Sequence, residues 1–234
     1  MRLDHILLTK GDGKQRKPLV VIHGLLASKM SFKPLFNDED LLEERDYYLI
    51  DLRNGEYSDW HDENSYELYA DDIIRWADQN GLGKFDLFGH SMGAKCAQTV
   101  SILYPDRVDA VIAFDGAPVK QAVGSLHPYY NIFWRVISFM ATLEDYRDLK
   151  GMTRNDARKL LKEEFADNRA IAAILLKQMD TKDKSLKWIK NYKTLYCEDG
   201  GDVFHFDVDL RSQKDNVYHL IGQNGPENWN FEEY

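Results

Sequence analysis

This sequence predicts an α/β fold built on a mostly parallel sheet, on three observations. Near-continuous apolar runs such as residues 19–22 are typical of strands buried on both faces. Amphipathic stretches with helical spacing lie between these runs. A tight G-x-S-x-G turn then joins one run to the following helix. Strands and helices in alternation indicate βαβ units and therefore a parallel sheet.

The first half of the chain supplies the expected sheet and its helices. A first helix is predicted after residue 64, where Asn64 and Glu67 resemble a capping box and Gly81 fits the stop. A second helix is expected from the residue after Ser91 to Leu103, ended by Pro105. An acidic run at 38–40 indicates a solvated helix start. The expected strands are Leu3–Thr9, Leu19–His23, Tyr47–Asp51, Phe85–Gly89 and Ala110–Asp115.

From about residue 118 the strand pattern stops and a helical lid is expected. One aromatic helix is predicted over Tyr129–Thr142, another after Thr153 and Asp156, and a third from Ile171. Residues 194–197 and 203–208 flank Asp-Gly-Gly, which is a hairpin signal. Residues 212–222 are expected to form one more short helix. The predicted organisation is a core over 1–117, a lid over 118–222 and a polar tail over 223–234.

Composition excludes several classes of function. The net charge of -9 over 234 residues disfavours nucleic acid and anionic membranes as partners. No apolar run approaches the length of a bilayer span, and no signal peptide is recognised at the start. Cys96 and Cys197 form neither a disulfide framework nor a metal motif. We expect no cofactor and no metal, and a reducing intracellular compartment, the mitochondrial matrix or the cytoplasm.

The strongest chemical signal is the segment from Gly89 to Gly93. It follows a strand and precedes a helix, as a nucleophile elbow requires, and its glycines leave room for a very tight turn. Such a turn projects the Ser91 hydroxyl above the sheet, at a helix N-terminus that favours a developing oxyanion. A chance occurrence of the motif in a loop is the alternative.

A second signal, His23-Gly24-Leu25, follows the strand over residues 19–22. In a fold with such an elbow, the loop after this strand supplies one oxyanion donor. We therefore predict an oxyanion hole made by the backbone N–H groups of Leu25 and Met92. A plain turn at His23-Gly24 is the alternative.

These segments together resemble a known family, the α/β-hydrolase esterases. The subgroup is that of small bacterial esterases and mitochondrial α/β-hydrolase-domain proteins, whose elbow reads GHSMGGK. The resemblance covers residues 18–118 and continues weakly through the lid. It is carried by His23-Gly24-Leu25, Asp51-Leu52-Arg53-Asn54, the segment from Gly89 to Lys95, Tyr104-Pro105-Asp106-Arg107-Val108 and Phe114-Asp115-Gly116-Ala117-Pro118.

The resemblance implies that Asp115 is the catalytic acid, because this subgroup carries its acid after the strand that follows the elbow. A carboxylate at the end of a buried strand beside the nucleophile strand is also well placed to orient an imidazole. A turn or helix cap without a catalytic role is the alternative.

The chain departs from the family where the catalytic histidine is concerned. The family's histidine follows the last strand, and no histidine of this chain matches that position. Gly55-Glu56-Tyr57-Ser58 also replaces a His-Gly-Asp-Ser type sequence. Without a base, Ser91 is a weak nucleophile. The family's C-terminal part is therefore expected to be missing. The seven histidines are His5, His23, His61, His90, His127, His205 and His219.

Two functions remain open at this stage. The first is a serine esterase acting on a carboxylic ester or thioester, inactive as this chain alone because the histidine is missing. The second is a non-catalytic hydrolase-fold subunit, a pseudoenzyme, with a structural role in a complex. If no further strands follow, the apolar strand Ala110–Phe114 becomes an outer edge, which predicts that another protein chain covers it. The lid aromatics, among them Phe139, could line an acyl pocket or simply pack.

Overall fold

The computed structural model of the chain describes residues 1–116, 135–141, 148–149, 151–180, 186–195 and 216–220. Its core is a six-stranded sheet with the order β1-β3-β2-β4-β5-β9. β1 runs antiparallel to β3, and every other neighbouring pair is parallel. The strands are β1 (His5–Leu8), β2 (Lys17–Ile22), β3 (Arg45–Ile50), β4 (Phe85–His90), β5 (Val108–Phe114) and β9 (Val217–Leu220).

The five strands expected in the first half are confirmed, with every boundary within two residues. Their apolar runs are long because both faces of the sheet are buried. On β2, Val20 and Ile22 belong to one hydrophobic cluster, whereas Leu19 and Val21 belong to the other. Alternate side chains of a strand point to opposite faces, so a strand between two packed layers needs apolar residues throughout.

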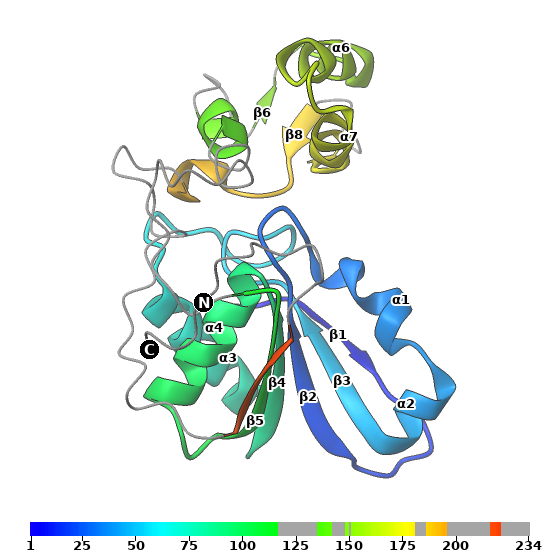
Figure 1. Cartoon of the computed structure of the whole chain (residues 1–234), viewed down its shortest axis with the longest axis vertical. Helices are drawn as coiled ribbons and strands as arrows, with labels where there is room; N and C mark the ends of the chain where they lie inside the picture. Colours follow the sequence, from blue (N-terminus) through cyan, green and yellow to red (C-terminus); the bar gives the residue numbers. More distant parts are fainter. Residues whose placement is uncertain (117–134, 142–147, 150, 181–185, 196–215, 221–234) are drawn as a thin grey trace.

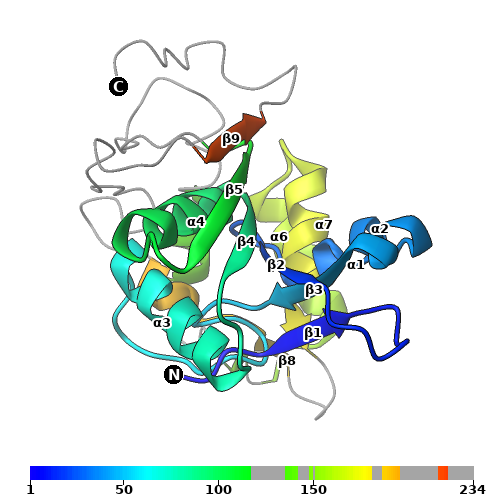
Figure 2. The ribbon, with the colours of Figure 1, turned by 90° about the horizontal axis from the view of Figure 1, so that it is seen from below.

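Helices cover both faces of this sheet. α3 (Tyr66–Gln79) and α4 (Met92–Leu103) lie on one face, and η1 (Lys29–Ser31), α1 (Lys33–Phe36) and α2 (Glu39–Glu44) lie on the other (Figure 2). The acidic start of α2 is confirmed, since the Asp38 side chain accepts from the N–H groups of Asp40 and Leu41. The cap predicted for α3 is one residue off, because the Ser65 hydroxyl, not Asn64, accepts from the Leu68 N–H. Asn64 is instead buried beside this turn.

A cap lies over the loops that follow β2 and β3 (Figure 1). It contains a helical stretch at 135–141 and the helices α6 (Arg154–Glu164) and α7 (Arg169–Lys177). The predicted capping box of Thr153 and Asp156 is confirmed. The cap also holds a small antiparallel sheet that the sequence did not predict. Its strands, in the order β6-β8-β7, are β6 (Asp148–Leu149), β8 (Leu186–Trp188) and β7 (Met179–Asp180).

The segment expected to be a helix at 212–222 contains strand β9 instead, so that prediction is wrong. β9 pairs in parallel with Val111–Phe114 of β5. Its exposure alternates: Tyr218 and Leu220 are 61% and 51% exposed, whereas Val217 and His219 are half-buried. This period of two fits a sheet edge, and the unpaired backbone of β5 provides the hydrogen bonds that override a local helix.

The pairing of β9 with β5 also corrects the expected partner. The edge at Ala110–Phe114 is covered over Val111–Phe114 by the chain itself, so it does not require a second polypeptide there. The expected hairpin strand at Thr194 begins as the 3-10 helix η2 (Tyr192–Leu195). The rest of the hairpin and the tail lie outside the described residues. Among the helices described, none is long and apolar enough to cross a membrane.

Candidate active site

Ser91 occupies the turn between β4 and α4, as the sequence predicts. Its backbone adopts φ 53° and ψ -117°, a region that residues with a Cβ rarely enter. Such a conformation costs roughly 1–3 kcal/mol and persists only where the surrounding structure enforces it. Here the Ser91 N–H donates to the Phe114 carbonyl at 2.9 Å, which ties the turn to the end of β5.

The flanking glycines are required by close backbone approach. A Cβ on Gly89 would lie 2.1 Å from the Gly93 carbonyl oxygen, and one on Gly93 would lie 2.4 Å from the Ile22 carbonyl oxygen. Gly116 is equally constrained, because its Cβ would lie 2.6 Å from the Ser91 carbonyl oxygen. The end of β2, the elbow and the residue after Asp115 therefore meet at one place.

The turn after β2, which we call the oxyanion turn (residues 23–27), lies directly against the elbow. A Cβ on Gly24 would be 3.2 Å from the Cβ of Ser91. The Ala27 N–H donates to the Gly24 carbonyl at 3.2 Å, and Leu26 between them has φ 59°. Within the described part of the chain, no residue accepts a hydrogen bond from the N–H of Leu25 or Met92. These donors remain our predicted oxyanion hole.

His23 is a structural member of this turn. Burial, followed by the charge of Lys190, lowers its pKa to about 3, so its ring is neutral. Nδ1 lies 2.8 Å from the Gly24 carbonyl and donates to it, and Nε2 accepts from the Leu52 N–H at 3.4 Å. Both ring nitrogens are thereby used within the fold.

Asp51, at the end of β3, is the centre of a buried ionic cluster beside His23. Its carboxylate is fully buried and accepts from the Lys29 backbone N–H at 2.8 Å and from Lys29 Nζ at 2.5 Å. His23 Nε2 lies 3.5 Å away. Although burial alone would raise it, the pKa of Asp51 is lowered by the hydrogen bonds that Lys29 donates to the carboxylate.

Asp115 follows β5 on the other side of the elbow. Its φ of 49° lies in the left-handed region that Asp and Asn tolerate, and its N–H donates to the Leu220 carbonyl at 2.8 Å. Its Oδ1 atom is buried and has no hydrogen-bond partner among the described residues. A buried carboxylate oxygen without a donor is costly, so this atom calls for a partner that the described residues do not supply.

None of the described histidines bonds to Ser91 or Asp115. His5 contacts Trp76 from β1, His23 is committed to its turn, and His61 is exposed. His90 precedes Ser91 and lies near Asp115; burial lowers its pKa, and the Asp115 charge partly opposes this. His219 lies on β9, opposite Ala113. His127 and His205 lie outside the described residues.

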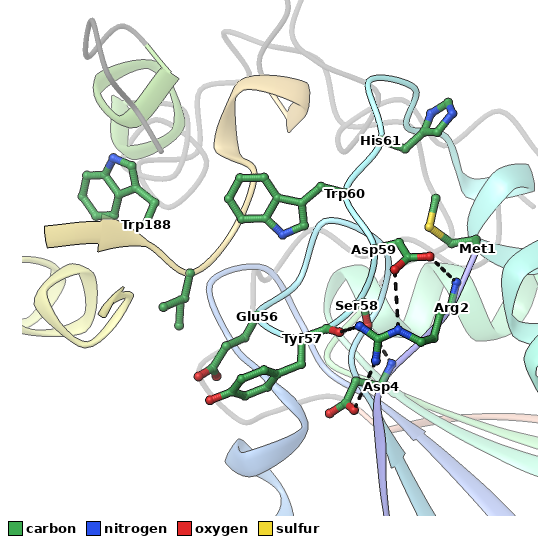
Figure 3. Close-up of a pocket in the computed structure, with 11 residues that line it drawn as sticks. Met1, Arg2, Asp4, Glu56, Tyr57, Ser58, Asp59, Trp60, His61 and Trp188 are labelled. Carbon is green, nitrogen blue, oxygen red and sulfur yellow. Dashed lines mark hydrogen bonds and ion pairs between the residues drawn. The ribbon is translucent and has the colours of Figure 1, made fainter. Parts of the chain in front are cut away.

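A cavity of about 1090 Å³ lies between the loop after β3, the N-terminus and β8. Figure 3 shows Arg2 between the carboxylates of Asp4 and Asp59, with Trp60 and Trp188 across the cavity. Neither Ser91 nor Asp115 lines it. Of the lid aromatics expected to line an acyl pocket, Phe139 packs edge-on against Phe165, and the others lie outside the described residues.

Sequence reasoning missed the lysines of this site. Lys29 and Lys190 are both buried, and Lys190 Nζ donates to the Ala27 carbonyl. A single lysine in a helical turn or a loop carries no motif. Only the folded structure shows that both lysine side chains lie near Asp51, directly after β3.

Comparison with known proteins identifies the family. The model for the alpha/beta hydrolase fold matches residues 17–140, more than half of the chain. The sn-1-specific diacylglycerol lipase ABHD11 of Danio rerio is 25% identical over 188 residues, which cover 79% of this chain and 56% of that protein. Esterase YbfF of Escherichia coli (strain K12) is 30% identical over 123 residues, which cover 53% and 48%.

A probable alcohol acetyltransferase of Saccharomyces cerevisiae is 28% identical over 174 residues, which cover 72% of this chain and 48% of that protein. The chain thus spans about half the length of these curated relatives. Among solved structures, a marine microorganism esterase superposes with a TM-score of 0.76 at 21% identity. That match covers 94% of this chain and 90% of the esterase, and it shows the shared fold.

Proposed function

The chain belongs to the α/β-hydrolase fold family, and from this premise we propose that it is built for acyl transfer through Ser91. The substrate class is a carboxylic ester or thioester. Lipase, esterase and acetyltransferase are the activities named for the similar proteins, and all three fit an acyl group carried on oxygen. The observation that carries the proposal is the strained Ser91 turn with Gly24 packed against it.

The reaction follows from this arrangement. The Ser91 oxygen attacks the carbonyl carbon, and the carbonyl oxygen becomes an anion near the N–H groups of Leu25 and Met92. The bond to the leaving alcohol or thiol then breaks, which leaves the acyl group on Ser91. Water hydrolyses this acyl-serine and restores the hydroxyl. At each attack a base takes a proton and then returns it to the leaving group.

The base is the component that the described residues lack. The buried Oδ1 of Asp115 has no hydrogen-bond partner among the described residues, which supports a role for this carboxylate in orienting an imidazole. None of the described histidines hydrogen-bonds to this carboxylate. We therefore propose that the chain on its own turns over esters far more slowly than an enzyme with a complete triad.

The same observation favours a second candidate, a non-catalytic hydrolase-fold subunit. In that case the elbow is retained for its packing: Gly89, Gly93 and Gly116 interlock β2, β4 and β5 whether or not Ser91 reacts. The two candidates differ in one property, which is the reactivity of the Ser91 hydroxyl.

Turnover of p-nitrophenyl acetate and butyrate by the purified chain tests the proposal. We expect slow turnover, at least about 10³-fold below that of a complete serine esterase, because loss of one triad member typically costs this much or more. Ser91→Ala should remove what turnover there is. Identical rates for the wild type and Ser91→Ala would favour the non-catalytic candidate, and brisk turnover would show that a histidine of this chain does reach Asp115.

The reducing compartment expected from the cysteine count also stays a proposal. It is supported by Cys96, which is a free thiol buried in α4. Imaging of a tagged chain, with mitochondrial and cytoplasmic markers, distinguishes the two compartments expected.

A further inference from the structure

We infer that Lys190 is a positioning residue that holds the oxyanion turn in its strained shape from the cap side. The inference rests on the proposed function, because it assigns Lys190 a role in presenting the Leu25 N–H to the reacting carbonyl. The cap would then contribute to catalysis through Lys190, a residue that is distant from Ser91 in the sequence.

The contact itself is direct. Lys190 follows β8 in the segment that connects the cap to the core, and its side chain is only 5% exposed. Its Nζ donates to the carbonyl of Ala27, the last residue of the oxyanion turn. An ammonium group without water needs acceptors in the protein, so a buried lysine is costly unless it binds something.

The turn needs such support because of Leu26. A left-handed φ of 59° is unfavourable for a residue with a Cβ, and nothing about leucine favours it. Gly24 and Ala27 bracket this residue. The Gly24 carbonyl accepts from both the His23 ring and the Ala27 N–H, and the Ala27 carbonyl accepts from Lys190. The two ends of the turn are therefore each tied to a buried side chain.

The charges around Lys190 fit a supporting role. Asp51 and Glu56 face it and favour the ammonium form, whereas Lys29 opposes it. Its burial lowers the pKa to about 8, so the group is still mostly protonated at neutral pH. His23, the other titratable group against this turn, is neutral there. The cluster holds Lys190 in place without relying on solvent.

A second anchor allows the inference to be tested without detaching the cap. The neighbouring Asn191 donates from its backbone N–H to the Asn54 carbonyl at 3.0 Å and from Nδ2 to Asn54 Oδ1 at 3.3 Å. We expect these two hydrogen bonds to keep the segment around Asn191 bound to the loop after β3 when Lys190 is replaced. A substitution at Lys190 should therefore loosen the turn and leave the fold intact.

The experiment measures how fast Ser91 is modified by an alkyl fluorophosphonate, whose oxygen takes the place of the oxyanion. We compare Lys190→Met, which keeps most of the stem without the donor, with Lys190→Arg, which keeps a charge and donors. Lys177→Met, at the exposed end of α7, is the matched control. Inactivation rate and apparent affinity are measured separately, and thermal unfolding is recorded for each variant.

We expect the maximal inactivation rate of Lys190→Met to fall about 10- to 100-fold, the size expected when a reacting group is misplaced by about 1 Å. Its apparent affinity should match that of Lys177→Met at a temperature where both variants are folded, and Lys190→Arg should recover part of the rate. A Lys190→Met rate equal to that of Lys177→Met would overturn the inference. If Lys190→Met does not fold, Lys190→Gln replaces it under the same criteria.

Hydrogen exchange of the peptide covering residues 23–28 separates this inference from the proposed function. If the wild type reacts no faster than Ser91→Ala, the proposed function fails. In that case faster exchange of this peptide in Lys190→Met still supports the positioning contact. Unchanged exchange would overturn it.

Discussion

Two carboxylates, Asp51 and Asp115, each follow a strand of the same sheet, but their surroundings differ. Asp51, after β3, is fully buried and is surrounded by Lys29, His23 and Lys190. Asp115, after β5, has one buried oxygen with no hydrogen-bond partner among the described residues. Burial of a charge without partners is unfavourable, and folded proteins avoid it unless the site serves another purpose.

The difference distinguishes a carboxylate with a structural role, Asp51, from one that we assign to the proposed active site, Asp115. The Asp51 cluster is internally complete, so its role is to fix the loops after β2 and β3. Among the described residues the Asp115 site is incomplete, and it lies beside a serine that the backbone holds in a strained shape. Strain and unmet hydrogen bonding together are typical of a site selected for chemistry.

The largest effect is expected when the complete cluster is broken. Asp51→Asn should lower the free energy of unfolding by about 3–5 kcal/mol, because it leaves buried lysines facing a neutral group. Urea unfolding measures this change. Asp12→Asn, which removes an ion pair that Asp12 makes with Arg16 at the surface, is the control and should cost far less. A small loss at Asp51 would show that the cluster is not what stabilises these loops.

The next effect is a dependence of stability on pH that originates from His23. Its folded pKa of about 3 lies below its ordinary value of 6.5, so the unfolded chain binds a proton that the folded chain does not. Stability should therefore fall as the pH drops from 6.5 towards 3, by about 2 kcal/mol down to pH 4.5.

The variant His23→Gln isolates this contribution. Glutamine does not titrate, so the fall between pH 6.5 and 4.5 should be reduced by that amount. Asp51, whose pKa is lowered as well, should lose its contribution only below its ordinary range. Denaturant unfolding at a series of pH values provides the measurement, and an unchanged slope in His23→Gln would assign the acid sensitivity to other groups.

The smallest effect on stability is expected at the incomplete site. Asp115→Asn keeps the shape and tolerates the left-handed backbone, and it removes the charge from a carboxyl group whose buried Oδ1 has no hydrogen-bond partner among the described residues. Its unfolding free energy should be unchanged or higher by up to about 1 kcal/mol. A loss of several kcal/mol would place Asp115 in the same structural class as Asp51 and would weaken its assignment to the active site.

The core of the fold was predictable from sequence because its local and long-range signals agree. The apolar run of β2 and the glycines of the elbow specify the same arrangement. β9 was mispredicted because four residues of a short edge strand carry little pattern of their own. Their structure is determined by β5, which lies about a hundred residues away in sequence.

The candidate site also contains some residues that the sequence predicts and others that it does not. Ser91, Gly24 and Asp115 belong to motifs, and the sequence places all three at the ends of strands, as the structure does. Lys190 could not be found, because its contact with Ala27 depends on how the cap docks on the core. The unpartnered Oδ1 of Asp115 was equally out of reach, since it is a property of the packed structure alone.

The central claim is our proposal that Ser91 and Asp115 belong to a hydrolase site for which the described residues supply no imidazole, and added imidazole tests it most directly. The measurement is the yield of phosphonylated Ser91, by peptide mass spectrometry, with and without imidazole in the buffer. Ser91→Ala and Asp115→Asn are the controls. The account predicts that imidazole accelerates modification of Ser91 in the wild type and much less in Asp115→Asn. Equal rates with and without imidazole, or equal acceleration in both proteins, would contradict it.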